Sequence, residues 1–191
     1  MLDATRDRIA RSVSRLLPAA MRRFLKRQDG AAAVEFGMVA LPFFGLMFAI
    51  LQTALVFFAS QSLEAAVAEA SRQIMTGQVQ QANYTASQFK TNIVCAYLAA
   101  GVSMFDCANG ISVSVQTYTT FSAASTTPPV TNGQLDTSNL PYTPGGPGDI
   151  VVVQLYYLWP VYVSLLGDNL SNIGTMRLLV ATSVFRNEPY Q

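Results

Sequence analysis

The sequence predicts an α+β protein, in which a long N-terminal helix packs on a small antiparallel β-sheet domain. Three features predict this: an uncharged stretch over 36–60, helical spacing of apolar residues as far as residue 77, and alternating strand patterns after residue 110. Charged residues make up 12% of the chain, against about 25% in typical soluble domains. A membrane segment attached to a polar domain explains this deficit, as does the mean hydropathy of +0.30.

Charge is distributed unevenly along the chain. Residues 1–30 hold eight Lys or Arg against three Asp, and residues 31–191 hold four basic against eight acidic residues. A basic segment before an apolar one remains on the cytoplasmic side, so we expect the acidic body to be exported. The basic arm is better explained by the adjacent membrane segment than by nucleic acid, which is not an expected partner. Within it, residues 4–27 are either an amphipathic helix on the inner leaflet or a leader that fixes topology.

Residues 31–63 form the predicted membrane helix. The 25 residues from Phe36 to Ser60 carry no charge, and about 20 suffice to cross the hydrocarbon core. A secretory signal peptide has a shorter apolar region followed by a small-residue cleavage site, so a retained helix is favoured. We expect Pro42 to kink it. Glu35 stands just before this run, where a carboxylate is costly unless something binds it.

Amphipathic patterns predict that helical structure continues beyond the membrane. In 61–77 one face carries Leu63, Val67, Ala70 and Ile74, and Gly77 is a plausible stop. A second helix is expected over 84–100, ending at Gly101. Its predicted apolar face consists of Phe89, Ile93, Ala96, Tyr97 and Ala100.

Three strands are predicted in the remainder of the chain, over 111–121, 149–159 and 175–188. All three are rich in β-branched or aromatic residues. Three consecutive strands favour an antiparallel meander. Residues 122–148 are rich in Ser, Thr, Pro and Gly, and predict a long exposed loop. The predicted organisation is a leader at 1–30, a helix at 31–77 that is transmembrane over about 36–60, and an exported domain at 78–191.

Cys95 and Cys107 are the two cysteines of the chain. In an exported domain they meet an oxidising compartment, so we expect a disulfide; two free buried thiols are the alternative. Their spacing is no metal signature, and the chain has no histidine to complete one. We therefore expect neither a metal nor another cofactor.

Enzymatic chemistry has little support in the sequence. The chain lacks histidine, a GxSxG motif and a phosphate-binding glycine loop. Lys90 is the one lysine of the exported part, on a helix face expected to be exposed, and a hydrolase built around it is the weakest hypothesis. We predict a protein that is not an enzyme.

The residues around Glu35 carry a family resemblance. A basic leader ending in Gly30, four apolar residues, and then Glu35 and Phe36 resemble the prepilin-peptidase site of type IV pilins. The stretch GAAAVEFGMVALPFF is similar to the TadE-like family, minor pseudopilins of the tight-adherence (Flp-type, type IVb) pilus system. The ending FRNEPY, 185–190, is also similar to members of that family. The likeness covers the N-terminal third and part of the last strand, whereas 78–174 carry little that is specific.

The resemblance implies a pilin-like fold and cleavage between Gly30 and Ala31 by a membrane peptidase. Glu35 would then be the fifth mature residue, able to pair with the new ammonium of its own or an adjacent subunit. With Phe36 it would register one subunit against the next; the alternative is that Glu35 lies at the cytoplasmic interface beside Lys26 and Arg27 and has no specific role. Ala33 and Gly37 are expected to allow close helix packing.

The implied location is a bacterial inner membrane, crossed once, with a cytoplasmic N-terminus and a periplasmic C-terminal domain, and with possible incorporation in a pilus. The implied partners are the prepilin peptidase, other pilin and pseudopilin subunits, the pilus assembly platform and the lipid bilayer. The leader, at 30 residues, is longer than a minimal one. An uncleaved single-pass anchor that recruits pilus or secretion components is therefore the alternative function.

Overall fold

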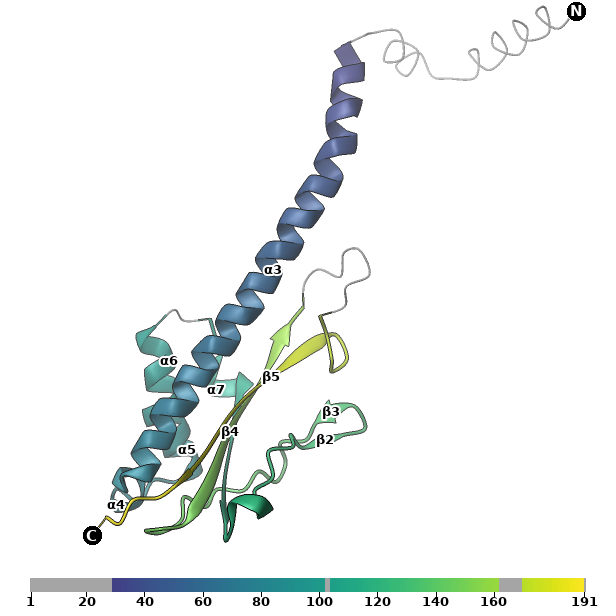
Figure 1. Cartoon of the computed structure of the whole chain (residues 1–191). Coiled ribbons are helices and arrows are strands. Elements are labelled where there is room, and N and C mark those ends of the chain that lie inside the picture. The colour runs from purple at the N-terminus through teal and green to yellow at the C-terminus, as the bar shows by residue number, and fades with distance from the viewer. Residues whose placement is uncertain (1–28, 102–103, 162–169, 191) are drawn as a thin grey trace, which may run out of the picture. The chain divides into compact units, whose positions relative to one another are not determined.

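The computed structural model describes residues 29–101, 104–161 and 170–190 (Figure 1). The leader expected at 1–28 and most of the connector after Pro160 lie outside these residues. Contacts divide the chain into two compact units, Met1–Phe48 and Ala49–Gln191. The combination of a long apolar helix and a small antiparallel sheet confirms the predicted α+β class.

Helix α3, Asp29–Met75, is the longest element and continues through Pro42. It is long and apolar enough to cross a membrane. It ends where the sequence predicts, because Gly77 takes a positive φ of 79° that a residue with a side chain adopts at a cost. The amide of Gly77 donates to the carbonyl of Ile74 at 3.0 Å.

Three antiparallel strands form the sheet of the second unit, in the order β1-β4-β5. They are β1 (Ile111–Tyr118), β4 (Ile150–Pro160) and β5 (Met176–Arg186). In the register, Val153 lies opposite both Val115 of β1 and Ser183 of β5. The predicted meander is therefore confirmed, and β4 is its central strand.

The core of the second unit lies between one face of this sheet and α3. The predicted helix face is buried, and odd-numbered residues of β4 belong to the same cluster, since alternate side chains of a strand share a face. Even-numbered residues such as Val152 and Tyr156 are buried too, on the other face of the strand. The members of this cluster include Leu63, Val67, Ala70, Ile74, Val151, Val153 and Leu155. Burial of these apolar side chains, worth about 25 cal/mol per Å², holds the C-terminal part of α3 to the sheet.

The predicted helix over 84–100 is present, but its buried face differs from the prediction. It consists of α5 (Ala86–Phe89), the π-helical segment η1 (Lys90–Cys95) and α6 (Ala96–Ala100). Phe89 and Ile93 are buried as predicted, whereas Ala96 and Ala100 are exposed and Tyr97 is 43% exposed. Val94 and Leu98 are buried instead. A π turn accommodates one extra residue, so the buried face moves by one position beyond it.

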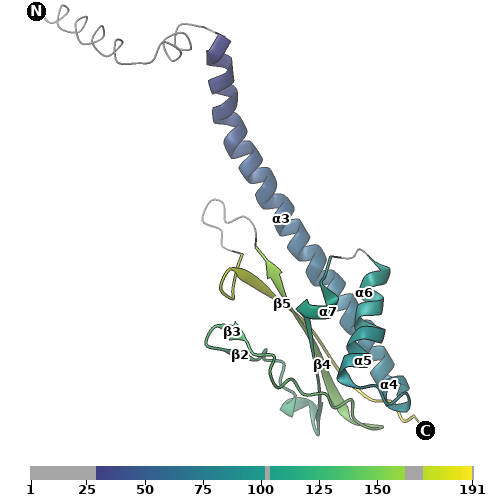
Figure 2. The same ribbon diagram turned by 180° about the vertical axis from the view of Figure 1, so that it is seen from behind.

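Short helices complete this side of the unit: α4 (Gln78–Gln81) after α3, and α7 (Cys107–Gly110) before β1. Figure 2 shows the small helices gathered beside the C-terminal part of α3. Helix α5 begins with a capping box, in which Thr85 and Gln88 satisfy each other's backbone amides.

The segment 122–148 is more ordered than the long exposed loop that the sequence predicts. It begins within the 3-10 turn η2 (Phe121–Ala123) and contains a small hairpin of β2 (Val130–Thr131) and β3 (Gln134–Leu135). Residues 141–143 then run beside β1, where Val115 donates to Pro141 and accepts from Thr143, both at 2.8 Å. The carbonyl of Pro141 and the amide of Thr143 are thus satisfied by the edge of the sheet.

Candidate functional site

The residues predicted for processing and docking all lie in the first two turns of α3. Gly30 and Ala31 are helical, and Glu35 lies four residues after Ala31, about one helical turn away. Glu35 and Phe36 are exposed, and Glu35 forms no ion pair with another described residue. An exposed carboxylate in an apolar helix is chemically able to bind a cation from outside the chain. Cleavage and docking at these residues remain predictions.

Ala33 and Gly37 are also four residues apart, so they share one face of the helix. A Cβ atom added at Gly37 would meet nothing within 4 Å, and the same holds for Gly45. The chain itself therefore gives no packing reason for a glycine at position 37. The role of Ala33 and Gly37 in helix packing stays a prediction.

The predicted disulfide between Cys95 and Cys107 is confirmed. It joins the end of η1 to the start of α7, with Cα atoms 5.6 Å apart and a separation of twelve positions in sequence. Near it, the ring of Phe105 packs edge-on against Tyr157 at 5.0 Å. The covalent bond thus fixes the small helices where they cover the sheet.

Lys90 is half-buried, so the expectation of an exposed side chain is wrong. Its ammonium donates to the carbonyl of Ala108 at 2.8 Å, beside the disulfide. Burial lowers the pKa of Lys90, and the nearby Asp106 carboxylate opposes this effect. The contact supports a structural role for Lys90, namely holding α7 against η1. Among the described residues, no cluster of acidic or cysteine side chains could hold a metal ion.

The sequence analysis missed a clasp formed by residues 187–190. The amide of Asn187, a buried side chain, donates to the carbonyls of Pro144 and Gly146, each at 3.0 Å. The amide nitrogen of Glu188 donates to the carbonyl of Met75, the last residue of α3. The clasp therefore connects the end of α3 to the segment before β4.

Tyr190 completes the clasp. Its ring lies against Gly77, where a Cβ atom would collide with it, and its hydroxyl donates to the carbonyl of Gly145 at 3.3 Å. The FRNEPY ending was noted for its resemblance alone. Asn187, a polar residue directly after the last strand, was the available signal in the sequence. The residues that its side chain binds, however, lie more than 40 positions away.

Comparison with known proteins adds one finding and two negative results. Residues 30–72 match the sequence profile of the family described as TadE-like protein. The match lies entirely within α3, begins at Gly30 and does not reach the sheet. No curated protein matches the chain, and no solved structure does. The family is associated with the tight-adherence pilus. The resemblance predicted from the sequence is therefore confirmed over this segment: residues 30–72 are TadE-like.

Proposed function

We propose that the chain is a minor pilin-like subunit, a pseudopilin, that serves assembly or initiation of a Flp-type type IV pilus. In this proposal a prepilin peptidase removes residues 1–30, residues 31–77 form the helix, and 78–191 form the exported domain. The observation that carries it is that the family match begins at Gly30 and stays within α3. The expected partners are the peptidase, other pilin subunits, the assembly platform and the bilayer of the inner membrane.

Glu35 has a specific task in this mechanism. Cleavage after Gly30 creates an ammonium group at Ala31, one turn before the Glu35 carboxylate. A carboxylate costs a few kcal/mol at the membrane centre, and at the edge of the span, where Glu35 lies, pairing with an ammonium offsets the smaller cost that remains. The pair forms within one subunit or between neighbours. Pairing between neighbours would align each arriving subunit at a fixed height.

An uncleaved anchor is the second candidate function. It keeps the basic leader, and it recruits pilus or secretion components through its periplasmic domain. The sequence observation that favours it is the leader of 30 residues, with eight basic side chains to fix topology without any cleavage.

The N-terminus of the mature chain separates the two candidates. We expect mass spectrometry of the protein from membranes to find a chain that begins at Ala31. Gly30→Val should leave the leader attached, whereas the matched variant Gly45→Val, at a helix position with open space around it, should be processed normally. An intact leader on the unaltered protein would contradict the pseudopilin proposal and favour the anchor.

The docking role needs a separate test, because cleavage can occur without it. Glu35→Gln removes the charge while it keeps the size of the side chain. We expect normal cleavage but loss of co-purification with other pilus subunits. Glu64→Gln is the control, since Glu64 is also exposed on α3. If Glu35→Gln assembles as well as the control, the docking role is wrong.

A further inference from the structure

Two turns of α3 face two different surroundings at the same height along the helix. On one side Gln52, Val56 and Ala59 are buried in the second unit, and Gln52 retains 8% of its exposure. On the other side Leu55, Phe57 and Phe58 are open, with Phe57 68% exposed. Any molecule that covers the exposed side of α3 therefore lies at the same level along the helix as the globular unit.

The open side changes from apolar to polar within one turn. Large apolar side chains are exposed at intervals along α3 up to Phe58. Gln61 and Glu64 follow as exposed residues, and the Gln61 amide donates to the Glu64 carboxylate at 3.0 Å. No Asp, Glu, Lys or Arg occurs between Glu35 and Glu64. This boundary is typical of the edge of a hydrocarbon layer.

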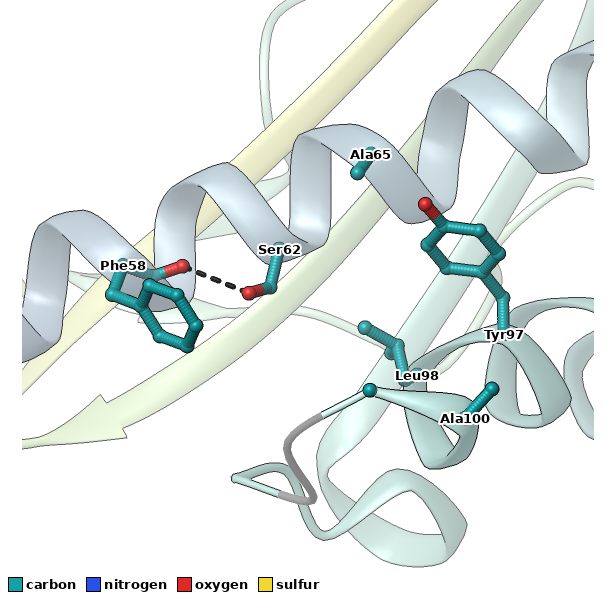
Figure 3. Close-up of a pocket in the computed structure, with 7 residues that line it drawn as sticks. Phe58, Ser62, Ala65, Tyr97, Leu98 and Ala100 are labelled. Carbon is teal, nitrogen blue, oxygen red and sulfur yellow. Dashed lines mark hydrogen bonds between the residues drawn. The ribbon is translucent and has the colours of Figure 1, made fainter.

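A groove lies at the same boundary, between α3 and α6 (Figure 3). It has a volume of about 430 Å³. Phe58 lies toward one end, and the Tyr97 hydroxyl points toward α3 near Ala65. Tyrosine is enriched at membrane interfaces, because its ring is apolar and its hydroxyl is polar. The residues that line the groove are Phe58, Ser62, Ala65, Tyr97, Leu98, Ala100 and Gly101.

The length needed to cross the membrane distinguishes two residues of α3 at which the hydrocarbon core could end, Gln52 and Phe58. About 20 residues cross the hydrocarbon core. If the core ended at Gln52, where burial begins, the span would start at about residue 32, and Glu35 would lie inside it. If it ends at Phe58, the span starts at about residue 39, and Glu35 stays at the cytoplasmic interface. The second position avoids burying a carboxylate in hydrocarbon, which is costly.

We infer that phospholipid of the outer leaflet covers the Leu55–Phe58 side of α3 and enters the groove between α3 and α6. The globular unit is then seated in the leaflet, at the boundary of headgroups and acyl chains, and does not stand above it. The occupant is lipid, because the exposed apolar surface continues directly from the membrane span. The inference rests on that span, and hence on the membrane location in the proposed function.

Cysteine labelling of the full chain in liposomes tests this inference, since the two native cysteines are paired. A fluorophore is attached to Phe58→Cys, and quenching by doxyl-labelled phospholipid is measured. Leu41→Cys, in the span, is the positive control, and Ala68→Cys, exposed further along α3, is the negative control. Ala100→Cys tests the groove, with the exposed Ala86 at the start of α5 as its control.

We expect quenching at positions 41, 58 and 100, and none at 68 or 86. A label at 58 that is not quenched, while the label at 41 is, overturns the inference and leaves the span intact. If position 58 then cross-links to its counterpart in another copy, the occupant is protein rather than lipid. Absence of quenching at 41 overturns the membrane span itself, and with it both proposals. Native Trp159 fluorescence verifies that each variant is folded.

Discussion

Two stretches of α3 differ in their surroundings although one helix contains both. In residues 32–51 no side chain is buried, and large apolar residues are exposed in every direction. In residues 59–75 the large apolar side chains Leu63, Val67 and Ile74 are buried, and the exposed positions are polar or small. Because apolar surface avoids water, the first stretch requires a surrounding apolar medium, whereas the second supplies its own partner, the sheet.

Exchanging a leucine for alanine in each stretch gives the largest expected difference. Leu63 is fully buried, so Leu63→Ala should lower the free energy of unfolding by about 2–5 kcal/mol through lost burial and a cavity. Leu41 is 78% exposed, and Leu41→Ala should leave that free energy unchanged. Urea denaturation of the full chain in detergent, followed by Trp159 fluorescence, measures both. Equal effects would show that the two stretches do not differ as described.

Removal of the disulfide should destabilise the unit in which α3 packs on the sheet, and should leave the membrane-spanning part of α3 unaffected. Cys107→Ser opens a loop of twelve positions, which the chain-entropy model values at about 3 kcal/mol. The same denaturation experiment should show this loss, while membrane insertion should stay unchanged. The double variant Cys95→Ser with Cys107→Ser should match the single one, because either change breaks the same bond. A larger loss in the double variant would indicate a role for the thiols beyond the bond.

Gly37→Ala examines the exposed stretch for a partner outside the chain. The added methyl group meets nothing in the chain, and alanine is about 1 kcal/mol better than glycine inside a helix. We expect no loss of folding or insertion, but reduced co-purification with other pilus subunits. Gly45→Ala, with equally open surroundings, is the matched control. Full co-purification of Gly37→Ala would contradict the predicted packing face.

The smallest expected effect is a change in the free energy of unfolding with pH that depends on Glu69. The hydrogen bond from Arg72, at 2.7 Å, and a further one from Gln73 lower the pKa of Glu69. A lowered folded-state pKa means that the contribution to stability is present above the ordinary value of 4.5 and is lost as the pH falls through the lowered value. The pair is largely exposed, so the change should be small. Glu69→Gln should flatten this part of the pH–stability curve; an unchanged curve would contradict the assignment.

The sequence contained enough information for the elements whose pattern is local. Leu63, Val67, Ala70 and Ile74 repeat at helical spacing and are buried together, and the β-branched run in β4 became the central strand. The disulfide followed from the number of cysteines and the expected compartment. In the candidate site, the spacing of Gly30, Ala31 and Glu35 was readable, and the roles of these residues still need experiments.

Other features depend on geometry that no short pattern encodes. The π turn at Lys90–Cys95 shifted the buried face from Tyr97 to Leu98, because periodicity assumes a regular α-helix. The pairing of Pro141 and Thr143 with β1 and the contacts of Asn187 join residues far apart in sequence. Such contacts are selected by the folded backbone, so residue type alone does not reveal them.

The clasp at 187–190 also sets the order in which the fold can form. Among the described residues it is the last segment to be synthesised, yet it holds the end of α3 and the segment before β4. In the topology proposed above, α3 enters the membrane before the clasp segment crosses it. The globular unit therefore gains the contacts of the clasp only after residues 187–190 have been synthesised, and until then the end of α3 and the segment before β4 are not held together by it.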